Sequence, residues 1–196
     1  TMAQVALWDY PVIVWLRIVA DQGDTRILDM GGHMGTKAIA FAPYLPMDRL
    51  DWTVADLPAV VRAARAAQAE GRVPDAIRFV TDPAAAGPCD LFLASGLLQY
   101  LDRPLGAVLA ALPQRPRRVL LNKVALREGE TLVTLEKIGP NRVPYQIRGR
   151  AGFEAELSAA GYAVRDSWEI PALAHRIATH PGRGPSTSRG FLLERI

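Results

Sequence analysis

The sequence predicts an α/β protein with a mostly parallel, doubly wound, seven-stranded sheet and an antiparallel hairpin at its C-terminal edge. First, apolar strand-like runs alternate with helical segments over residues 25–126, a rhythm typical of βαβ units. Second, residues 89–95 are apolar without alternation, as expected of a strand buried on both faces. Third, the alternation stops after residue 126, and two strand-like runs follow, 163–170 and 189–196. Joined by a long loop, these two runs can pair antiparallel.

Each element has a local reason. Pro58 opens an alanine-rich helix that ends at Gly71, because proline suits the first turn and glycine follows the last. The helix that starts at Gly35 stops before Pro46, which removes a backbone donor. The segment 137–150 contains Gly and Pro at several positions and is predicted to be a shaped loop. The expected strands are 25–30, 51–57, 76–82, 89–95, 117–126, 163–170 and 189–196, and the expected helices are 11–20, 35–45, 58–71, 103–113 and 149–162.

The N-terminal residues 1–24 are expected to form a helix beside a single domain of residues 25–196. Apolar side chains recur there at helical spacing, namely Val12, Trp15, Leu16 and Val19. Such a helix either packs on the domain or covers a ligand as a lid. Its aromatic residues Trp8, Tyr10 and Trp15 are a candidate contact for a homodimer.

Composition limits the function classes. The 196 residues are 49% hydrophobic and 22% charged, which fits one globular domain. A single cysteine allows no intrachain disulfide, and no signal-peptide pattern is visible, so we expect a cytoplasmic protein. The longest apolar run, 11–20, is too short for a membrane span. A net charge of only +3 does not indicate a nucleic-acid partner.

A glycine-rich turn follows the first strand, in the stretch ILDMGGHMGTK at residues 27–37. Glycines there let a ligand approach the backbone. Asp56 ends the next strand, where a carboxylate can accept hydrogen bonds from a ribose diol. The spacing fits neither the dinucleotide pattern G-x-G-x-x-G nor a phosphate-binding loop. It does fit D-x-G-x-x-x-G, formed by Asp29, Gly31 and Gly35.

Four segments together resemble class I S-adenosylmethionine-dependent methyltransferases: ILDMGGHMG, WTVADLPAVV, DLFLASGLLQYL and LLNKVALREGETLVTLEKIGPNRVPYQI. More narrowly, they resemble an uncharacterised bacterial methyltransferase family, some of whose members lie among surface-polysaccharide genes. The resemblance covers residues 10–196. It implies a Rossmann-like fold, S-adenosylmethionine as cofactor and S-adenosylhomocysteine as product. It also implies a small-molecule or sugar acceptor, with O-methylation foremost and N-methylation as the alternative.

The resemblance also implies roles for single residues. The turn of Gly31, Gly32, His33 and Gly35 would contact the methionine portion of the cofactor, and Asp29 would organise this turn or contact the amino group. Asp56 would hold the ribose hydroxyls. Four further residues would surround the adenine or line the path to the sulfonium. This group comprises Leu57 and Asp82 at the adenine, and Ser95 and Gly96 on the path.

Some of these residues have simpler explanations. Asp56 can cap the following helix, since aspartate is common at that position. His33 can cap the start of its own helix or bond a neighbouring carbonyl, instead of facing the cofactor carboxylate or the substrate. For Asp29 and Asp82, too, a purely structural role is the alternative to cofactor binding.

The catalytic residue is less evident. Many O-methyltransferases place a histidine after the fourth strand, where this chain has Gln99 and Tyr100. We therefore expect these two residues to contact substrate, and a base, if one is used, to come from elsewhere. The candidates are His33, Tyr145, His175 and His180. The last two lie in a loop, and the alternative is that they face solvent and have no catalytic role. No spacing typical of a metal site occurs, so no metal is expected.

The segment 137–150 is the second candidate site. Asn141, Arg142, Tyr145 and Arg148 offer polar groups there, and either arginine can clamp a carboxylate or phosphate. Solvated surface arginines are the alternative.

Other function classes stay open. A catalytically silent protein that keeps the fold as a partner or scaffold is one, because no base stands at Gln99. An NAD(P)-dependent oxidoreductase is less favoured, because the third dinucleotide glycine is missing. A nucleic-acid methyltransferase is less favoured still, because no Asn/Asp-Pro-Pro-Tyr motif follows the fourth strand.

Overall fold

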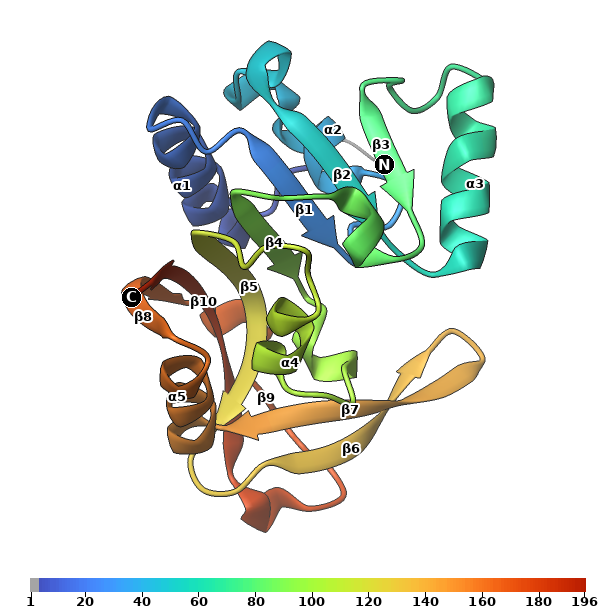
Figure 1. The fold of residues 1–196 in the computed structure, drawn as a ribbon. Helices are drawn as coiled ribbons and strands as arrows, with labels where there is room; N and C mark the ends of the chain where they lie inside the picture. Colours follow the sequence, from blue (N-terminus) through green and yellow to red (C-terminus); the bar gives the residue numbers. More distant parts are fainter. Residues whose placement is uncertain (1–3) are drawn as a thin grey trace.

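The computed structural model describes residues 4–196 and shows a twisted sheet with helices on both faces (Figure 1). Its main path runs β3-β2-β1-β4-β5-β10-β8. The strands are β1 (Arg26–Met30), β2 (Asp51–Ala55), β3 (Ile77–Val80), β4 (Leu91–Ser95), β5 (Arg118–Arg127), β6 (Leu132–Ile138), β7 (Asn141–Gly149), β8 (Tyr162–Glu169), β9 (His175–Arg176) and β10 (Pro185–Arg195). The helices are α1 (Tyr10–Asp21), α2 (Thr36–Phe41), α3 (Pro58–Ala69), α4 (Leu105–Ala110) and α5 (Arg150–Ala159).

The predicted α/β fold is confirmed. Strands β1 to β5 run parallel along the main path. Strand β10 lies between β5 and β8 and is antiparallel to both, which gives the expected C-terminal hairpin at the edge. Three further strands, β6, β7 and β9, lie off the seven-stranded path, so the sheet is larger than predicted.

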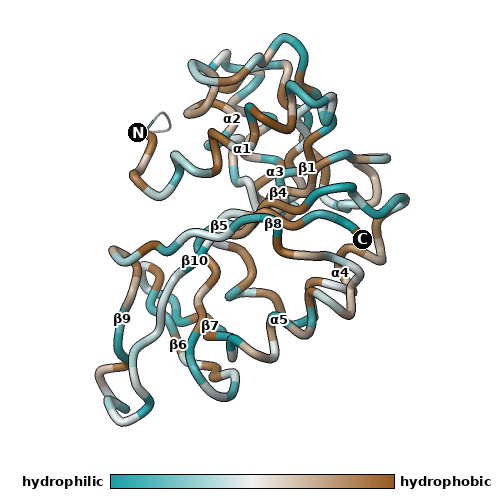
Figure 2. The backbone as a smooth tube through the Cα atoms, turned by 90° about the vertical axis from the view of Figure 1, so that its left-hand side faces the viewer, coloured by the Kyte–Doolittle hydropathy of each residue, from teal (hydrophilic) through white to brown (hydrophobic). Residues whose placement is uncertain are grey.

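Two apolar layers hold the helices to the sheet. One packs α1, α2 and α3 against β1 and β2 around the buried Trp52. The other packs α4 and α5 against β4 and β5, with Phe92 and Phe153 inside it. Figure 2 shows hydrophobic chain where β1 and β4 cross the middle of the molecule, and hydrophilic chain around β9. Burial of this apolar surface is the main force that stabilises the fold.

The segment 137–150 is not a loop, and this prediction was wrong. Residues Leu132–Ile138 and Asn141–Gly149 pair residue by residue as an antiparallel hairpin, and the glycine and proline at 139 and 140 form only its turn. Pro144 lies opposite Leu135 on a strand without a second neighbour at that point, where a missing N–H is tolerated. In Figure 1 the hairpin lies on the side toward which the arrowheads of β1, β4 and β5 point.

The N-terminal helix α1 is part of the domain core. Val12, Leu16 and Val19 are buried among residues of the sheet, and the Trp15 indole donates a hydrogen bond to Asp166 Oδ2 at 2.7 Å. A lid function and a dimer contact therefore remain predictions, and of the three aromatic residues only Tyr10 is exposed. None of the helices within residues 4–196 combines the length and apolar character that a membrane-spanning helix needs.

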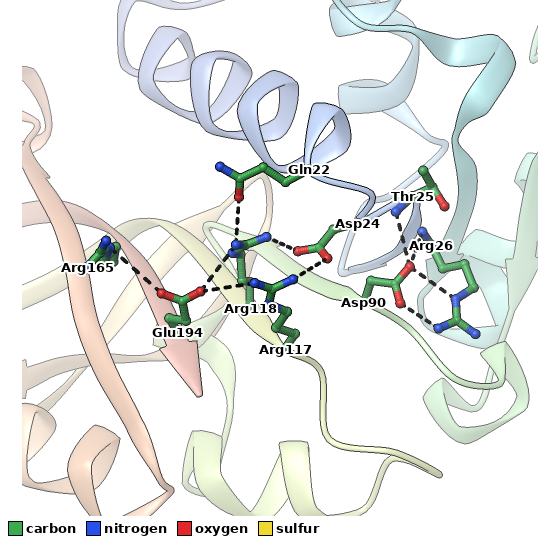
Figure 3. A network of polar contacts seen from close by, with 9 residues as sticks. All are labelled: Gln22, Asp24, Thr25, Arg26, Asp90, Arg117, Arg118, Arg165 and Glu194. Carbon is green, nitrogen blue, oxygen red and sulfur yellow. Dashed lines mark hydrogen bonds and ion pairs between the residues drawn. The ribbon is translucent and has the colours of Figure 1, made fainter. Parts of the chain in front are cut away.

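A buried ion pair joins the end of α1 to the start of β5 (Figure 3). Arg118 and Asp24 are both nearly inaccessible and pair directly. The Arg118 guanidinium also donates to Gln22 Oε1 at 2.8 Å and to Glu194 at 3.3 Å. Because the charges are satisfied on several sides, the arrangement fixes the position of α1 relative to β5 and β10.

Arg118→Met should destabilise the fold by about 3–5 kcal/mol, because it leaves Asp24 buried without its main partner. Arg117→Met is the matched control: Arg117 lies 3.8 Å from the same carboxylate but is 56% exposed, so its removal should cost less than about 1 kcal/mol. Urea unfolding of both variants measures the difference. Equal losses would show that Arg118 contributes no more than a surface charge.

Candidate functional site

The turn after β1 brings backbone to the carboxyl edge of the sheet. Gly31 has a φ of +72°, a conformation that favours glycine. Its N–H donates to the carbonyl of Ala55 at 2.8 Å, which ties the turn to the end of β2. Helix α2 begins directly after the turn, at Thr36. The turn therefore opens toward the point where the strand order reverses between β1 and β4.

Asp56 closes the same turn from the next strand. Its Oδ2 accepts the His33 N–H at 2.8 Å, and its Oδ1 accepts the Leu57 N–H at 2.7 Å. Each carboxylate oxygen can accept a second hydrogen bond. Asp56 thus organises the turn and still has acceptor capacity for a ligand.

Two adjoining cavities lie over these strand ends. The larger, of about 680 Å³, is called the large cavity here, and the smaller, of about 230 Å³, the small cavity. They share Gly31, Asp56, Leu57, Leu97 and Leu101. The small cavity is closed by Pro58, Thr81 and Pro83. The large cavity continues to the β6–β7 hairpin, which contributes Val133, Ile138, Val143, Pro144 and Gln146.

Unpaired polar atoms gather where β4 ends. Ser95 Oγ and Gln99 Oε1 are buried and have no hydrogen-bond partner among residues 4–196. Between them, Gly96 lines the large cavity with a φ of +75°. Buried polar atoms normally have partners, so these two oxygens are unusual, and of the two residues Gln99 lines the large cavity.

Asp29 supports the turn from behind. Its carboxyl group is buried, and this burial raises its pKa to about 7, although the Trp52 indole donates to it at 3.2 Å. A Cβ at Gly32 would overlap this carboxyl group. The buried Asp29 carboxyl group therefore leaves room only for glycine at position 32. Neither Asp29 nor Gly32 lines the large or the small cavity, so their predicted contact with the cofactor remains a prediction.

Gly35, His33 and Asp82 do not line either cavity, and their predicted cofactor contacts remain predictions. A Cβ at Gly35 would lie 2.9 Å from Ile77 Cδ1, so this glycine allows the turn to pack on β3. The His33 side chain is exposed, and only its backbone N–H is engaged, with Asp56. Asp82 is exposed and accepts the N–H of Ala84 at 3.0 Å, while its neighbours Thr81 and Pro83 line the small cavity.

The remaining base candidates lie on the other side of the hairpin. Tyr145 and His175 line an outer cavity of about 400 Å³ between β6 and the loop before β10, with ring centroids 6.0 Å apart. His180 and Arg142 line a further hollow beside it. Within the described part of the chain, no histidine lines the large or the small cavity.

Tyr100 connects the two sides of the hairpin. It lines the large cavity, its hydroxyl donates to Glu136 on β6, and its ring meets that of Tyr145 edge-on at 5.6 Å. Burial, followed by the bond to Glu136, raises the pKa of Tyr100 above its usual value. Tyr100 is therefore suited to hold a substrate in place and unsuited to act as a base at neutral pH.

Arg148 and Asn141 do not reach the cavities. The Arg148 guanidinium donates to the carbonyl of Leu98 at 3.2 Å and to Glu156 at 3.3 Å, and so connects β7 to α5. Asn141 is exposed at the turn of the hairpin. Within residues 4–196 there is no group of three or more His, Cys, Asp and Glu that could hold a metal ion.

The site also contains residues that sequence reasoning missed. Leu97 and Leu101 lie between the two cavities, and apolar residues of the hairpin form the far wall of the large cavity. The alternation of apolar residues at 131–138 was a usable signal, because a strand with an exposed apolar face needs a partner or a ligand to cover it.

Asp29→Asn should remove a pH-dependent loss of stability. The folded protein keeps Asp29 protonated up to a pKa of about 7, whereas the unfolded chain ionises near 3.8. Stability from this group is therefore complete below pH 3.8 and declines as the pH rises to about 7, by a few kcal/mol as an order of magnitude. Urea unfolding at pH 4.5 and 7.5 should show the variant gaining on the wild type, and a constant difference between them would contradict a buried, protonated Asp29.

No protein-family model matches this chain, and no curated protein matches it either. Solved structures do. The mitomycin 7-O-methyltransferase MmcR is 20% identical with a TM-score of 0.55, over 89% of this chain and 50% of MmcR. This chain thus spans half the length of MmcR.

Two other structures match over most of both chains. The 1,6-didemethyltoxoflavin-N1-methyltransferase of Burkholderia thailandensis, bound to 1,6-didemethyltoxoflavin and S-adenosylhomocysteine, is 22% identical, with a TM-score of 0.59 over 96% of this chain and 78% of that one. The glycopeptide N-methyltransferase MtfA, in complex with S-adenosylmethionine, is 15% identical, with a TM-score of 0.60 over 94% of each chain. The strand order and these similarities together show that this chain has the Rossmann-like fold of the class I S-adenosylmethionine-dependent methyltransferases.

Proposed function

We propose that this protein transfers a methyl group from S-adenosylmethionine to a small-molecule acceptor. The observation that carries the proposal is the pair of cavities shared by the bare backbone of Gly31 and the carboxylate of Asp56. They lie at the strand ends where this fold class binds nucleosides. The structural neighbours with bound S-adenosylmethionine or S-adenosylhomocysteine support the same cofactor for this chain.

The residues present fit that cofactor. Asp56 has acceptor capacity for the two ribose hydroxyls. The small cavity has mainly apolar walls, from Leu57, Pro58, Pro83 and Leu101, and suits a flat adenine. Gly96 and Gln99 line the other end of the site, where the amino acid portion would lie.

The acceptor would occupy the part of the large cavity nearest the hairpin. Val133, Ile138, Val143 and Pro144 form an apolar wall there, and Tyr100 lies opposite. Such a wall binds apolar or aromatic surface better than a bare sugar. We therefore favour a compact acceptor with an apolar face and a hydroxyl group, and keep an amine as the alternative.

Catalysis would rest mainly on positioning. The bound cofactor supplies an electrophilic methyl group, and an in-line displacement requires the acceptor atom to be aligned with it. The hairpin and the segment 97–101 both line the cavity at this point and would position the acceptor. Tyr100, anchored to Glu136, orients the acceptor.

A second function is binding of the cofactor without turnover. It is favoured by one observation, namely that no histidine of residues 4–196 lines either cavity. A binding protein and an enzyme differ in a simple assay, because only the enzyme forms S-adenosylhomocysteine when hydroxylated or aminated aromatic compounds are added.

Calorimetric titration tests the cofactor directly. We expect S-adenosylhomocysteine to bind with a micromolar dissociation constant, about −8 kcal/mol. NADH is the control ligand, since the turn lacks the third glycine of a dinucleotide site. Binding of NADH in preference to the thioether would contradict the proposal.

Asp56→Ala should weaken S-adenosylhomocysteine binding by about 1–3 kcal/mol, because the ribose hydroxyls lose their acceptor. Asp82→Ala is the matched control, an exposed aspartate that follows the neighbouring strand and lines neither cavity. Titration of the two variants, with thermal melting to confirm folding, measures the effect. Asp56 has no part in the site if both variants bind like the wild type.

Gly31→Ala should abolish binding while the chain still folds. The added Cβ would lie 2.9 Å from Leu97 Cδ1, at the junction of the two cavities. Gly87→Ala controls for backbone strain, because Gly87 has a similar φ of +80° but open space around it. Each substitution costs about 1–2 kcal/mol of stability, and only the first should cost affinity.

A further inference from the structure

Strand β5 contains a bulge in its middle. Val124 pairs with Arg189 and Leu121 with Phe191 on β10, so that Asn122 and Lys123 together face Gly190. Lys123 has a φ of +58°, which is rare for a long side chain. Such bulges re-aim a side chain, and a strained residue persists only where its surroundings enforce it.

Neighbouring side chains enforce this bulge. The indole of Trp168 packs against β10 at Gly190, and a Cβ at this position would overlap the indole. The Trp168 indole donates to Asn122 Oδ1 at 3.3 Å. The Asn122 amide donates in turn to the carbonyl of Trp8 at 3.2 Å. Asn122 is thus held from two sides directly before Lys123.

The bulge directs the Lys123 amine toward the large cavity. A Cβ at Gly96 would lie 2.9 Å from Lys123 Cε and 3.0 Å from Lys123 Nζ. The same position is 3.7 Å from Gln99 Nε2. Gly96 and Gln99 both line the large cavity, so the Lys123 amine lies next to this part of the cavity wall, although Lys123 itself does not line the cavity.

The charges around Lys123 leave it without a partner. Asp9 is already paired with Lys37, whose Nζ lies within 2.7 Å of both carboxylate oxygens. Burial raises the pKa of the other nearby carboxyl group, that of Asp29, to about 7. Lys123 itself forms no ion pair of 4.0 Å or less in residues 4–196. Burial, with the positive charge of Lys37, lowers the pKa of Lys123, and the opposing effect of Asp9 and Asp29 is smaller. Burial and the Lys37 charge both favour the neutral form of the amine.

We propose that Lys123 is the general base of the methyl transfer, a role that rests on the proposed function. Its neutral amine takes the proton from the acceptor hydroxyl or amine. The acceptor lone pair forms the bond to the methyl carbon, the carbon–sulfur bond breaks, and its electrons remain on sulfur as the thioether. The resulting Lys123 ammonium then releases its proton to solvent.

The sulfonium charge assists this step. A positive charge beside Lys123 favours the neutral amine, because two like charges repel each other at short distance. Binding of S-adenosylmethionine should therefore release a proton from Lys123, and binding of the neutral thioether should not. The cofactor would in this way prepare its own base.

Calorimetry in two buffers of different ionisation enthalpy measures this proton release without a known acceptor. The wild type should release more protons with S-adenosylmethionine than with S-adenosylhomocysteine. The ratio of the affinity for S-adenosylmethionine to that for S-adenosylhomocysteine should rise at least about threefold with pH, as Lys123 loses its proton. Lys123→Met should lose the excess proton and the additional pH dependence. Lys123→Asn should behave alike and tolerates the positive φ, and Lys137→Met, which alters an exposed lysine of β6, should match the wild type.

Three results would overturn the proposal. Equal proton release in the wild type and Lys123→Met would show that Lys123 does not sense the sulfonium. A loss of affinity for both ligands alike in the Lys123 variants would make the residue a clamp for the cofactor carboxylate. If the wild type binds neither ligand, the proposed function fails as well, which separates that failure from the first two.

Discussion

The contact between the Asp29 carboxyl group and the glycine turn is the constraint on which the site depends. Asp29 is buried directly behind Gly32, so the turn has no room for a side chain at that position. Asp56 holds the turn from the front through the His33 N–H. With one carboxyl group on each side, the backbone of Gly31 is left facing the cavities, and this exposed backbone is what a nucleoside needs to approach.

The N-terminal segment stabilises the opposite side of the site. Asp9 is buried, pairs with Lys37 at the start of α2 and contacts the Asn122 amide at 3.4 Å. Asn122 is also the residue that holds the β5 bulge. The segment before α1 is therefore connected both to the glycine turn and to Lys123, although it lines neither cavity. This arrangement favours a structural role over a mobile lid.

The sequence predicted what depends on local patterns. The strand ends at Asp29 and Asp56 follow from apolar runs that stop at a charge, and the structure brings these two ends together as a parallel sheet must. Side-chain direction was not predictable in this way. The chemistry of a histidine or arginine suggested His175 and Arg148, but the hairpin separates the first from the large cavity, and the second is engaged with Glu156. The direction of the Lys123 side chain could not be predicted, because it depends on a bulge opposite Gly190, far along the chain.

The two halves of the site have different origins, and this difference bears on specificity. The cofactor half consists of strand ends and backbone, which the topology of the fold determines. The acceptor half consists of the β6–β7 hairpin, which lies off the main strand path and still exposes Val133 and Ile138 at 64% and 49%. Substitutions on the hairpin can change the shape of the large cavity without disturbing Gly31 or Asp56. In the proposed reaction the hairpin would therefore determine which acceptor is bound, and the strand ends would determine which cofactor is bound.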